Sequence, residues 1–165
     1  MEKTLTLRGL GIMLLFMLYA GNGIATTQPN CDQIIGMWMA NEKNIVVQVY
    51  KDGDSFKASI VWFDDSDDKT RPMDVRLDYK NPDKSLRTRK VLGMQVLKNL
   101  EYSASSNSWE NGVIYDAKNG HEWNSCASID KDGMLKVTGY WHFKFIGKSM
   151  KFSRVSSTER LLTSR

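Results

Sequence analysis

The sequence predicts an all-β protein, an eight-stranded antiparallel up-and-down barrel, on three observations. Apolar and polar residues alternate along short segments, which is the period of strands rather than of helices. Three dipeptides that favour tight hairpins lie between such segments: Asp52-Gly53, Asn119-Gly120 and Asp132-Gly133. Eight short strands joined mainly by hairpins favour closure, because a closed barrel leaves no exposed sheet edge.

The strands are expected to begin near residues 36, 45, 55, 91, 109, 121, 134 and 146. Alternation is clearest in the third and seventh. In the third, the apolar positions are Phe56, Ala58, Ile60 and Trp62; in the seventh, the corresponding positions are Leu135, Val137, Gly139 and Trp141. Each of these strands is therefore expected to turn one face towards a core and the other towards a wetter environment.

One long connection, from Asp64 to Lys90, shows no alternation, and connections of this length are usually functional or disordered. Asn81-Pro82 predicts a helix cap followed by a short helix that reaches Ser85 or Leu86. The connection opens with an acidic run that lacks the spacing and distal glutamate of a calcium loop, so we interpret it as solvated: Asp64, Asp65, Asp67 and Asp68.

The amino terminus has the three parts of a signal peptide. Lys3 and Arg8 precede an apolar run from Leu10 to Ala20, and Gly23-Ile24-Ala25 offers small residues for cleavage near Ala25. The run is shorter than the roughly 20 residues of a membrane span, so no integral span is expected in the mature chain. We therefore expect residues 1–25 to be a signal peptide, 26–155 one barrel domain and 156–165 a polar tail, in a periplasmic or secreted protein.

Composition excludes some partners and leaves the state of the cysteines open. The net charge of +4 is spread along the chain without a block of Lys and Arg, which argues against nucleic acid. Cys31 and Cys126 are an even pair, and in an oxidising compartment the simplest expectation is a disulfide bond between them. The alternative is two free, buried thiols.

Three residues are expected to close one end of the barrel. Trp38 on the first strand can lie across that end, Gly36 lets the chain pass beneath it, and Arg154 on the last strand can stack on the indole. This arrangement resembles the lipocalin and calycin barrels.

The order of further motifs resembles an uncharacterised bacterial family, domain of unknown function 2147, from Ile35 to Val155. The motifs are Gly36-Met37-Trp38, Ile60-Val61-Trp62, Asp78, Asn81-Pro82, Arg87-Thr88-Arg89, Leu92-Gly93, Trp109, Gly112-Val113-Ile114-Tyr115-Asp116, Asn119-Gly120, Gly139-Tyr140, Gly147 and Arg154. The resemblance implies a lipocalin-like barrel, and it carries no established catalytic or binding residues.

Arg87 and Arg89 form the most suggestive polar motif. In an extended segment they point to the same side, so two guanidinium groups could hold one carboxylate or phosphate, with Asp78 and Asn81 orienting them. The alternative is structural: the two arginines pair with Asp78 or with the acidic run and fix the long connection to the barrel.

Catalytic and metal sites are weakly indicated. His121 and His142 lack a second histidine or cysteine at ligand spacing, so no metal and no cofactor is expected. No Gly-x-Ser-x-Gly motif is present, and Asp116 with Glu122 fits the polar end of a hairpin better than a glycosidase acid pair. We expect the protein not to be an enzyme.

The leading hypothesis is a barrel that binds a small apolar or amphiphilic, anionic ligand, because eight strands enclose an interior that either fills itself or holds one small molecule. Trp62 and Trp141 would line the site beside the Arg87 and Arg89 group. The alternative is a filled barrel that acts as an envelope-associated interaction module, with a protein partner that the sequence does not identify.

Overall fold

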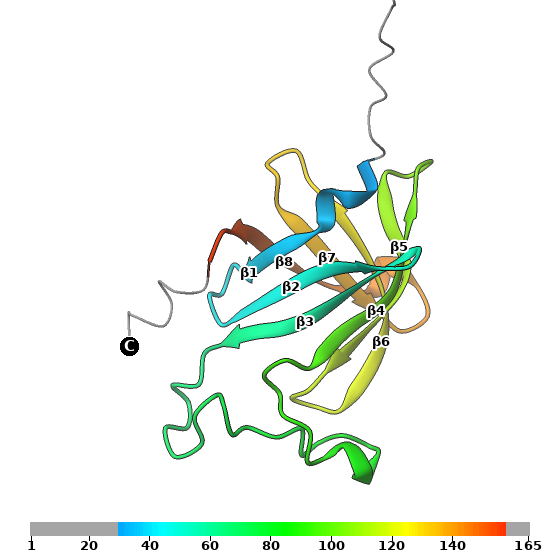
Figure 1. Cartoon of the computed structure of the whole chain (residues 1–165). Helices are drawn as coiled ribbons and strands as arrows, with labels where there is room; N and C mark the ends of the chain where they lie inside the picture. The colour runs from blue at the N-terminus through cyan, green and yellow to red at the C-terminus, as the bar shows by residue number, and fades with distance from the viewer. Residues whose placement is uncertain (1–29, 158–165) are drawn as a thin grey trace, which may run out of the picture.

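The computed structural model describes residues 30–157, and within them the chain forms a closed barrel of eight antiparallel strands in sequence order (Figure 1). The all-β, up-and-down barrel predicted from the sequence is confirmed. The predicted signal peptide and its cleavage site lie outside the described residues. The strands are β1 (Gly36–Ala40), β2 (Ile45–Asp52), β3 (Ser55–Phe63), β4 (Gln95–Ser103), β5 (Ser108–Asp116), β6 (His121–Ile129), β7 (Leu135–Tyr140) and β8 (Lys148–Val155).

Two strands begin later than predicted, each for a local reason. β4 begins at Gln95 rather than near residue 91, because the chain turns first: Gly93 has φ +83°, and its N–H donates to the Ile60 carbonyl at 2.8 Å. β8 begins at Lys148 rather than near residue 146, because the short helix η3 (Lys144–Ile146) precedes it. In both cases a turn precedes the strand, so its hydrogen bonds to the neighbouring strands begin a few residues later than predicted.

The helices are short 3-10 turns: η1 (Asn30–Ile34), η2 (Lys84–Leu86) and η3. The predicted cap of η2 was wrong by two residues. Asp83 caps it by accepting from the Ser85 N–H at 2.9 Å, while Asn81 accepts from the Asp83 N–H one step earlier. None of the helices within residues 30–157 has the length and apolar character needed to cross a bilayer.

One end of the barrel is closed where the first and last strands meet. Trp38 and Arg154 are register partners, and the Arg154 guanidinium carbon lies 4.2 Å from the centre of the Trp38 ring. Arg154 also donates to the carbonyls of Gln33 and Ile35, and the Trp38 indole N–H donates to the Ile34 carbonyl at 2.8 Å. Helix η1 is thereby held across this end.

Gly36 makes this closure possible. Its φ of +136° is a conformation that side-chain-bearing residues rarely adopt, and a Cβ atom there would collide with the Arg154 guanidinium. A glycine at this position therefore lets the arginine reach the backbone beneath the indole.

The closed half of the barrel is filled by large side chains. Trp38, Trp109, Phe56 and Leu100 are each at most 1% exposed. The Phe56 and Trp109 rings meet edge to face at 6.4 Å, and the Trp109 indole N–H donates to the Cys31 carbonyl at 3.0 Å. Each such side chain contributes about 1.5–3 kcal/mol through burial, so this half is a solid core.

The expected disulfide bond is not present, and both cysteines are free. On β6, Cys126 lies between the buried residues Ser125 and Ala127, so strand alternation turns it to the outer face of the barrel. Cys31 instead lies in η1 and packs against the core at the closed end. The two thiols belong to different surfaces, which is the physical reason that the simplest sequence-based pairing was wrong.

We expect Trp38→Ala to lower the free energy of unfolding by about 3–5 kcal/mol, because it removes the largest side chain of the closed end together with the stacked arginine contact. Trp141→Ala is the matched control: Trp141 is 61% exposed, and its loss is expected to cost under about 1 kcal/mol. Urea unfolding of both variants measures the difference. A loss under about 1 kcal/mol for Trp38→Ala would contradict this account of the closed end.

Candidate functional site

The end of the barrel opposite the Trp38 closure is open to solvent. Along β8, alternate residues share the inner face with Leu135, Val137 and Gly139 of β7. Phe152 is 5% exposed, Met150 is 38% exposed, and Lys148 is exposed. Inner-facing positions thus become progressively more accessible towards this end.

An apolar wall lines the open end on the side of β5, β6 and β7. Ile114 and Trp123 are register partners, and the Trp123 ring meets the Trp141 ring edge to face at 5.5 Å. Gly139 packs against this wall, since a Cβ atom there would be in van der Waals contact with Ile114 Cγ2 at 3.4 Å and with Trp123 Cβ at 3.7 Å. A hollow of about 440 Å³ lies beside Trp123, mainly on the outer side of β5 and β6, because Val113, Glu122 and Asn124 alternate with the inner-facing residues; its other lining residues are Trp141 and His142.

A buried hydroxyl lies just below this wall. Ser125 is the register partner of both Gly112 and Gly139, it is 0% exposed, and its Oγ has no hydrogen-bond partner within residues 30–157. A buried polar group without a partner is costly, so the Ser125 hydroxyl is a candidate contact for a polar atom of a bound molecule.

The long connection is anchored to the barrel by a buried carboxylate. Asp78 is 1% exposed, and its two oxygens accept three side-chain hydrogen bonds: from Arg89 Nη2 at 2.7 Å, from Asn81 Nδ2 at 2.8 Å and from Tyr115 Oη at 2.7 Å. Tyr115 belongs to β5, so this cluster joins the connection to the sheet. The Arg89 guanidinium also lies over the Tyr115 ring at 5.7 Å.

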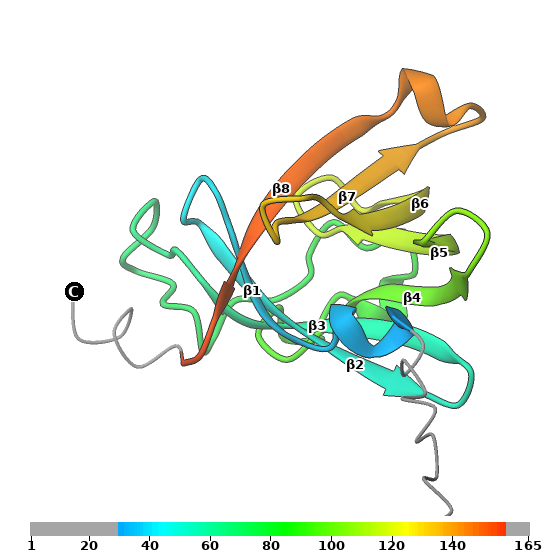
Figure 2. The same ribbon diagram turned by 90° about the horizontal axis from the view of Figure 1, so that it is seen from above.

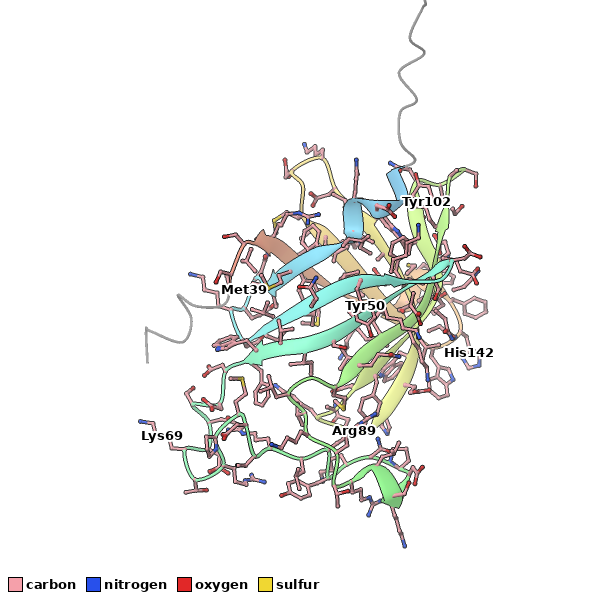
Figure 3. The ribbon with its side chains drawn as sticks, viewed as in Figure 1. Met39, Tyr50, Lys69, Arg89, Tyr102 and His142 are labelled. Carbon is pink, nitrogen blue, oxygen red and sulfur yellow. The ribbon has the colours of Figure 1, made fainter. Side chains whose placement is uncertain are left out.

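A second contact holds the connection against the β5–β6 turn. The Lys80 carbonyl approaches Gly120 so closely that a Cβ atom there would collide with it, and Gly120 has φ +72°. Arg87 Nε donates to the Asn81 carbonyl at 2.7 Å, which stabilises the path of the connection between these two contacts. Figure 3 shows Arg89 where the connection meets the strands, away from His142 on the β7–β8 segment.

The structure therefore separates the six residues predicted to bind ligand. Asp78, Asn81, Arg87 and Arg89 form the anchor of the long connection. Trp62 is 6% exposed and packs at the end of β3. Trp141 lies at the hollow beside Trp123, and none of the other five lines that hollow.

Sequence reasoning missed four residues at the open end: Ile114, Trp123, Lys148 and Met150. Tyr115 in the anchor was missed as well. The first four could be found only from the register of the strands, because the residue paired with each one in the neighbouring strand shows that it faces inward. Tyr115 carries no local pattern, since its partner Asp78 is 37 residues away.

A second groove, of about 550 Å³, lies on the outer side between β5–β8 and η3. An ion pair between Lys144 and Glu110 crosses it, and Cys126 lies among its lining residues. Burial alone would raise the pKa of Glu110, but hydrogen bonds from Lys144 and Ser108 outweigh burial and lower it. Burial and then the Glu110 charge raise the pKa of the Cys126 thiol, which disfavours the reactive thiolate.

The described residues contain no group of three or more His, Cys, Asp or Glu side chains placed to hold a metal ion. The histidines illustrate this: His121 and His142 contact the rings of Trp123 and Trp141 respectively, and both contacts are edge to face.

Residues 36–154 match the family described as "Uncharacterized protein conserved in bacteria (DUF2147)". The chain belongs to this family. No curated protein matches the chain. Among solved structures it is similar to protein HP1028 from Helicobacter pylori, whose title assigns that protein to the lipocalin family. The two share 21% identity with a TM-score of 0.65, over 79% of this chain and 88% of the other, and this likeness shows a lipocalin-like fold.

The Asp78 anchor predicts a specific loss of stability at high pH. Burial and the Asp78 carboxylate raise the pKa of Tyr115 from 10.0 to about 12, so the folded state keeps the phenol neutral where the unfolded state ionises. The hydrogen bond is expected to contribute about 1–3 kcal/mol below pH 10. This contribution should fade as the pH rises from about 10 to about 12.

The measurement is the difference in the free energy of unfolding between the wild-type protein and Tyr115→Phe, followed from pH 7 to pH 12. We expect a constant difference up to about pH 10 and a shrinking one above it. Parallel curves across the whole range would show that the phenol is not held neutral by the fold.

Proposed function

We propose that this family member is an exported, non-catalytic binding protein that takes a small apolar or amphiphilic molecule at the open end of its barrel. The observation that carries the proposal is the gradient of exposure along the inner face of β8, from Phe152 at 5% to Met150 at 38% and then to Lys148. An exposed inner face beside Ile114 and Trp123 offers apolar surface that a ligand would cover.

The size of the ligand is limited by the filled half of the barrel. Trp38, Trp109 and Phe56 occupy the interior near the closed end. An apolar chain can therefore enter only the open half, beside Met150 and Lys148. We infer a ligand with a short apolar chain, for which decanoate is a suitable probe.

Two cationic groups could hold an acidic head group. The first is the pair Arg87 and Arg89, of which Arg89 already forms an ion pair with the buried Asp78. The second is Lys148, which is exposed on the inner register of β8 and forms no ion pair with the described residues. We favour Lys148, because its charge is not offset and it lies on the same face as Gly139 and Met150.

A second candidate function is an interaction module with a filled barrel. The packing around Trp109 and the exposed aromatic residues between β7 and β8 favour it. Export, for either function, rests on the signal-peptide pattern of residues 1–25, with the periplasm or the exterior as the destination.

Calorimetric titration with decanoate tests the binding proposal. We expect the wild-type protein to bind decanoate, and Lys148→Ala to weaken binding about ten-fold through loss of a charge-assisted contact. Lys136→Ala is the matched control, since Lys136 is an exposed lysine on the other face of the neighbouring strand β7, and its affinity is expected to be unchanged.

Two further variants separate the alternatives. Gly139→Val places a branched side chain on the inner face beside Ile114 and is expected to abolish binding while the far-ultraviolet spectrum stays that of the wild-type fold. Arg87→Ala with Arg89→Ala is expected to leave the affinity for decanoate within about two-fold. Loss of binding in that double variant, with Lys148→Ala unaffected, would move the head group to the long connection; no binding by the wild-type protein would favour the interaction module.

A further inference from the structure

The segment between β7 and β8 exposes four large apolar side chains within six residues. Trp141 is 61% exposed, Phe143 60%, Phe145 84% and Ile146 71%. We call residues 141–146 the aromatic tip. Figure 2 shows this segment projecting beyond the rest of the barrel, past the ends of β7 and β8.

The rings of the aromatic tip contact one another, and its contacts with the strands include those of Trp141 with Trp123 and of Lys144 with Glu110. The Phe143 and Phe145 rings stack at 5.5 Å with an interplanar angle of 25°, and His142 lies between Trp141 and Phe143 in a chain of ring contacts. Single exposed apolar residues are common on protein surfaces, but a contiguous exposed patch marks a site of interaction with a membrane or another macromolecule.

The aromatic tip and its flanking strands contain basic residues and no acidic ones; Lys144 and Lys148 are nearest the tip, and Arg154 lies at the closed end. From Gly133 to Ser157 the sequence contains no Asp or Glu, and its cations are Lys136, Lys144, Lys148, Lys151 and Arg154. Glu110 and Asp130, from outside this stretch, offset Lys144 and Lys151. Lys136 and Lys148 form no ion pair with the residues that the structure describes.

We propose that the aromatic tip docks the barrel on a lipid bilayer that carries anionic head groups. The Trp ring lies at the level of the head groups, where its apolar body and polar edge are both accommodated, and the Phe and Ile side chains insert among the acyl chains. The lysines of β7 and β8 are attracted to the anionic lipid surface. Docking of this kind is peripheral and uses a few side chains at the end of a hairpin.

Charge complementarity selects the bilayer over a second copy of the chain. A symmetric dimer formed through the aromatic tip would bring the Lys148 charges of both copies together, and like charges at an interface are unfavourable. An anionic lipid surface instead neutralises the lysines as the rings insert. The docking goes beyond the proposed ligand site, and it holds whether or not the barrel binds a fatty acid.

Sedimentation of the protein with lipid vesicles tests the proposal. The vesicles are equal parts of phosphatidylglycerol and phosphatidylcholine, with pure phosphatidylcholine as the neutral comparison. We expect binding to the mixed vesicles, weaker binding to the neutral ones, and weakening by salt. Phe145→Ser with Ile146→Ser is expected to reduce the partition coefficient at least about ten-fold, since two inserted apolar side chains are lost.

The matched control is Val75→Ser with Leu86→Ser, which removes two exposed apolar residues, 49% and 39% exposed, from the long connection. It is expected to sediment like the wild-type protein. Equal loss in the control and tip variants, or no binding of the wild-type protein to mixed vesicles, overturns the proposal. A dimer of the wild-type protein in sedimentation equilibrium, with the tip variant a monomer, also overturns the proposal, because a second copy of the chain then covers the aromatic tip. Decanoate titration of the tip variant reports separately on the ligand site.

Discussion

An up-and-down barrel closes only if its first and last strands pair, and here the pairing of β1 with β8 is reinforced by a side-chain interaction across the same register position. Arg154 stacks on Trp38 and donates to the backbone of η1, which places that helix over the end of the barrel. Gly36 is required because a Cβ atom would occupy the place of the guanidinium. The packing of Trp109 follows, since its indole N–H is satisfied by the Cys31 carbonyl of the same helix.

Closure of one end determines what the other end can do. The filled half excludes water and supplies stability, so the strands β5–β8 extend beyond it without a complete core beneath them. Their inner faces there carry Ile114, which packs against the core, then Trp123 and the partly exposed Met150. The position of the long connection is a second constraint. Asp78 fixes it to Tyr115, which lies on the outer face of β5, whereas Lys148 lies on the inner face of β8. Rigid closure and an accessible end are thus two consequences of the same topology.

Local sequence patterns predicted the barrel because hairpin dipeptides and alternation act over a few residues, as in the segment from Phe56 to Trp62. They also brought Gly36, Trp38 and Arg154 together, since strands one and eight must meet in a closed barrel. The candidate site was harder, because Lys148 faces inward only through its register with Gly139, which depends on where η3 ends. The cysteines show the same limit. An even number of cysteines predicts a disulfide bond, whereas the alternation of β6 turns Cys126 to the outer face, away from Cys31.

The central claim is that one end of the barrel is sealed and the other receives a ligand, and the five indole N–H resonances of the ¹⁵N-labelled protein test it most directly. During titration with decanoate, Trp123 and Trp141 should shift, while Trp38 and Trp109, bonded to the carbonyls of Ile34 and Cys31, should stay fixed and exchange slowly with solvent. Single Trp→Phe variants assign the signals. Shifts of Trp38 and Trp109 with Trp123 and Trp141 unmoved would contradict the account.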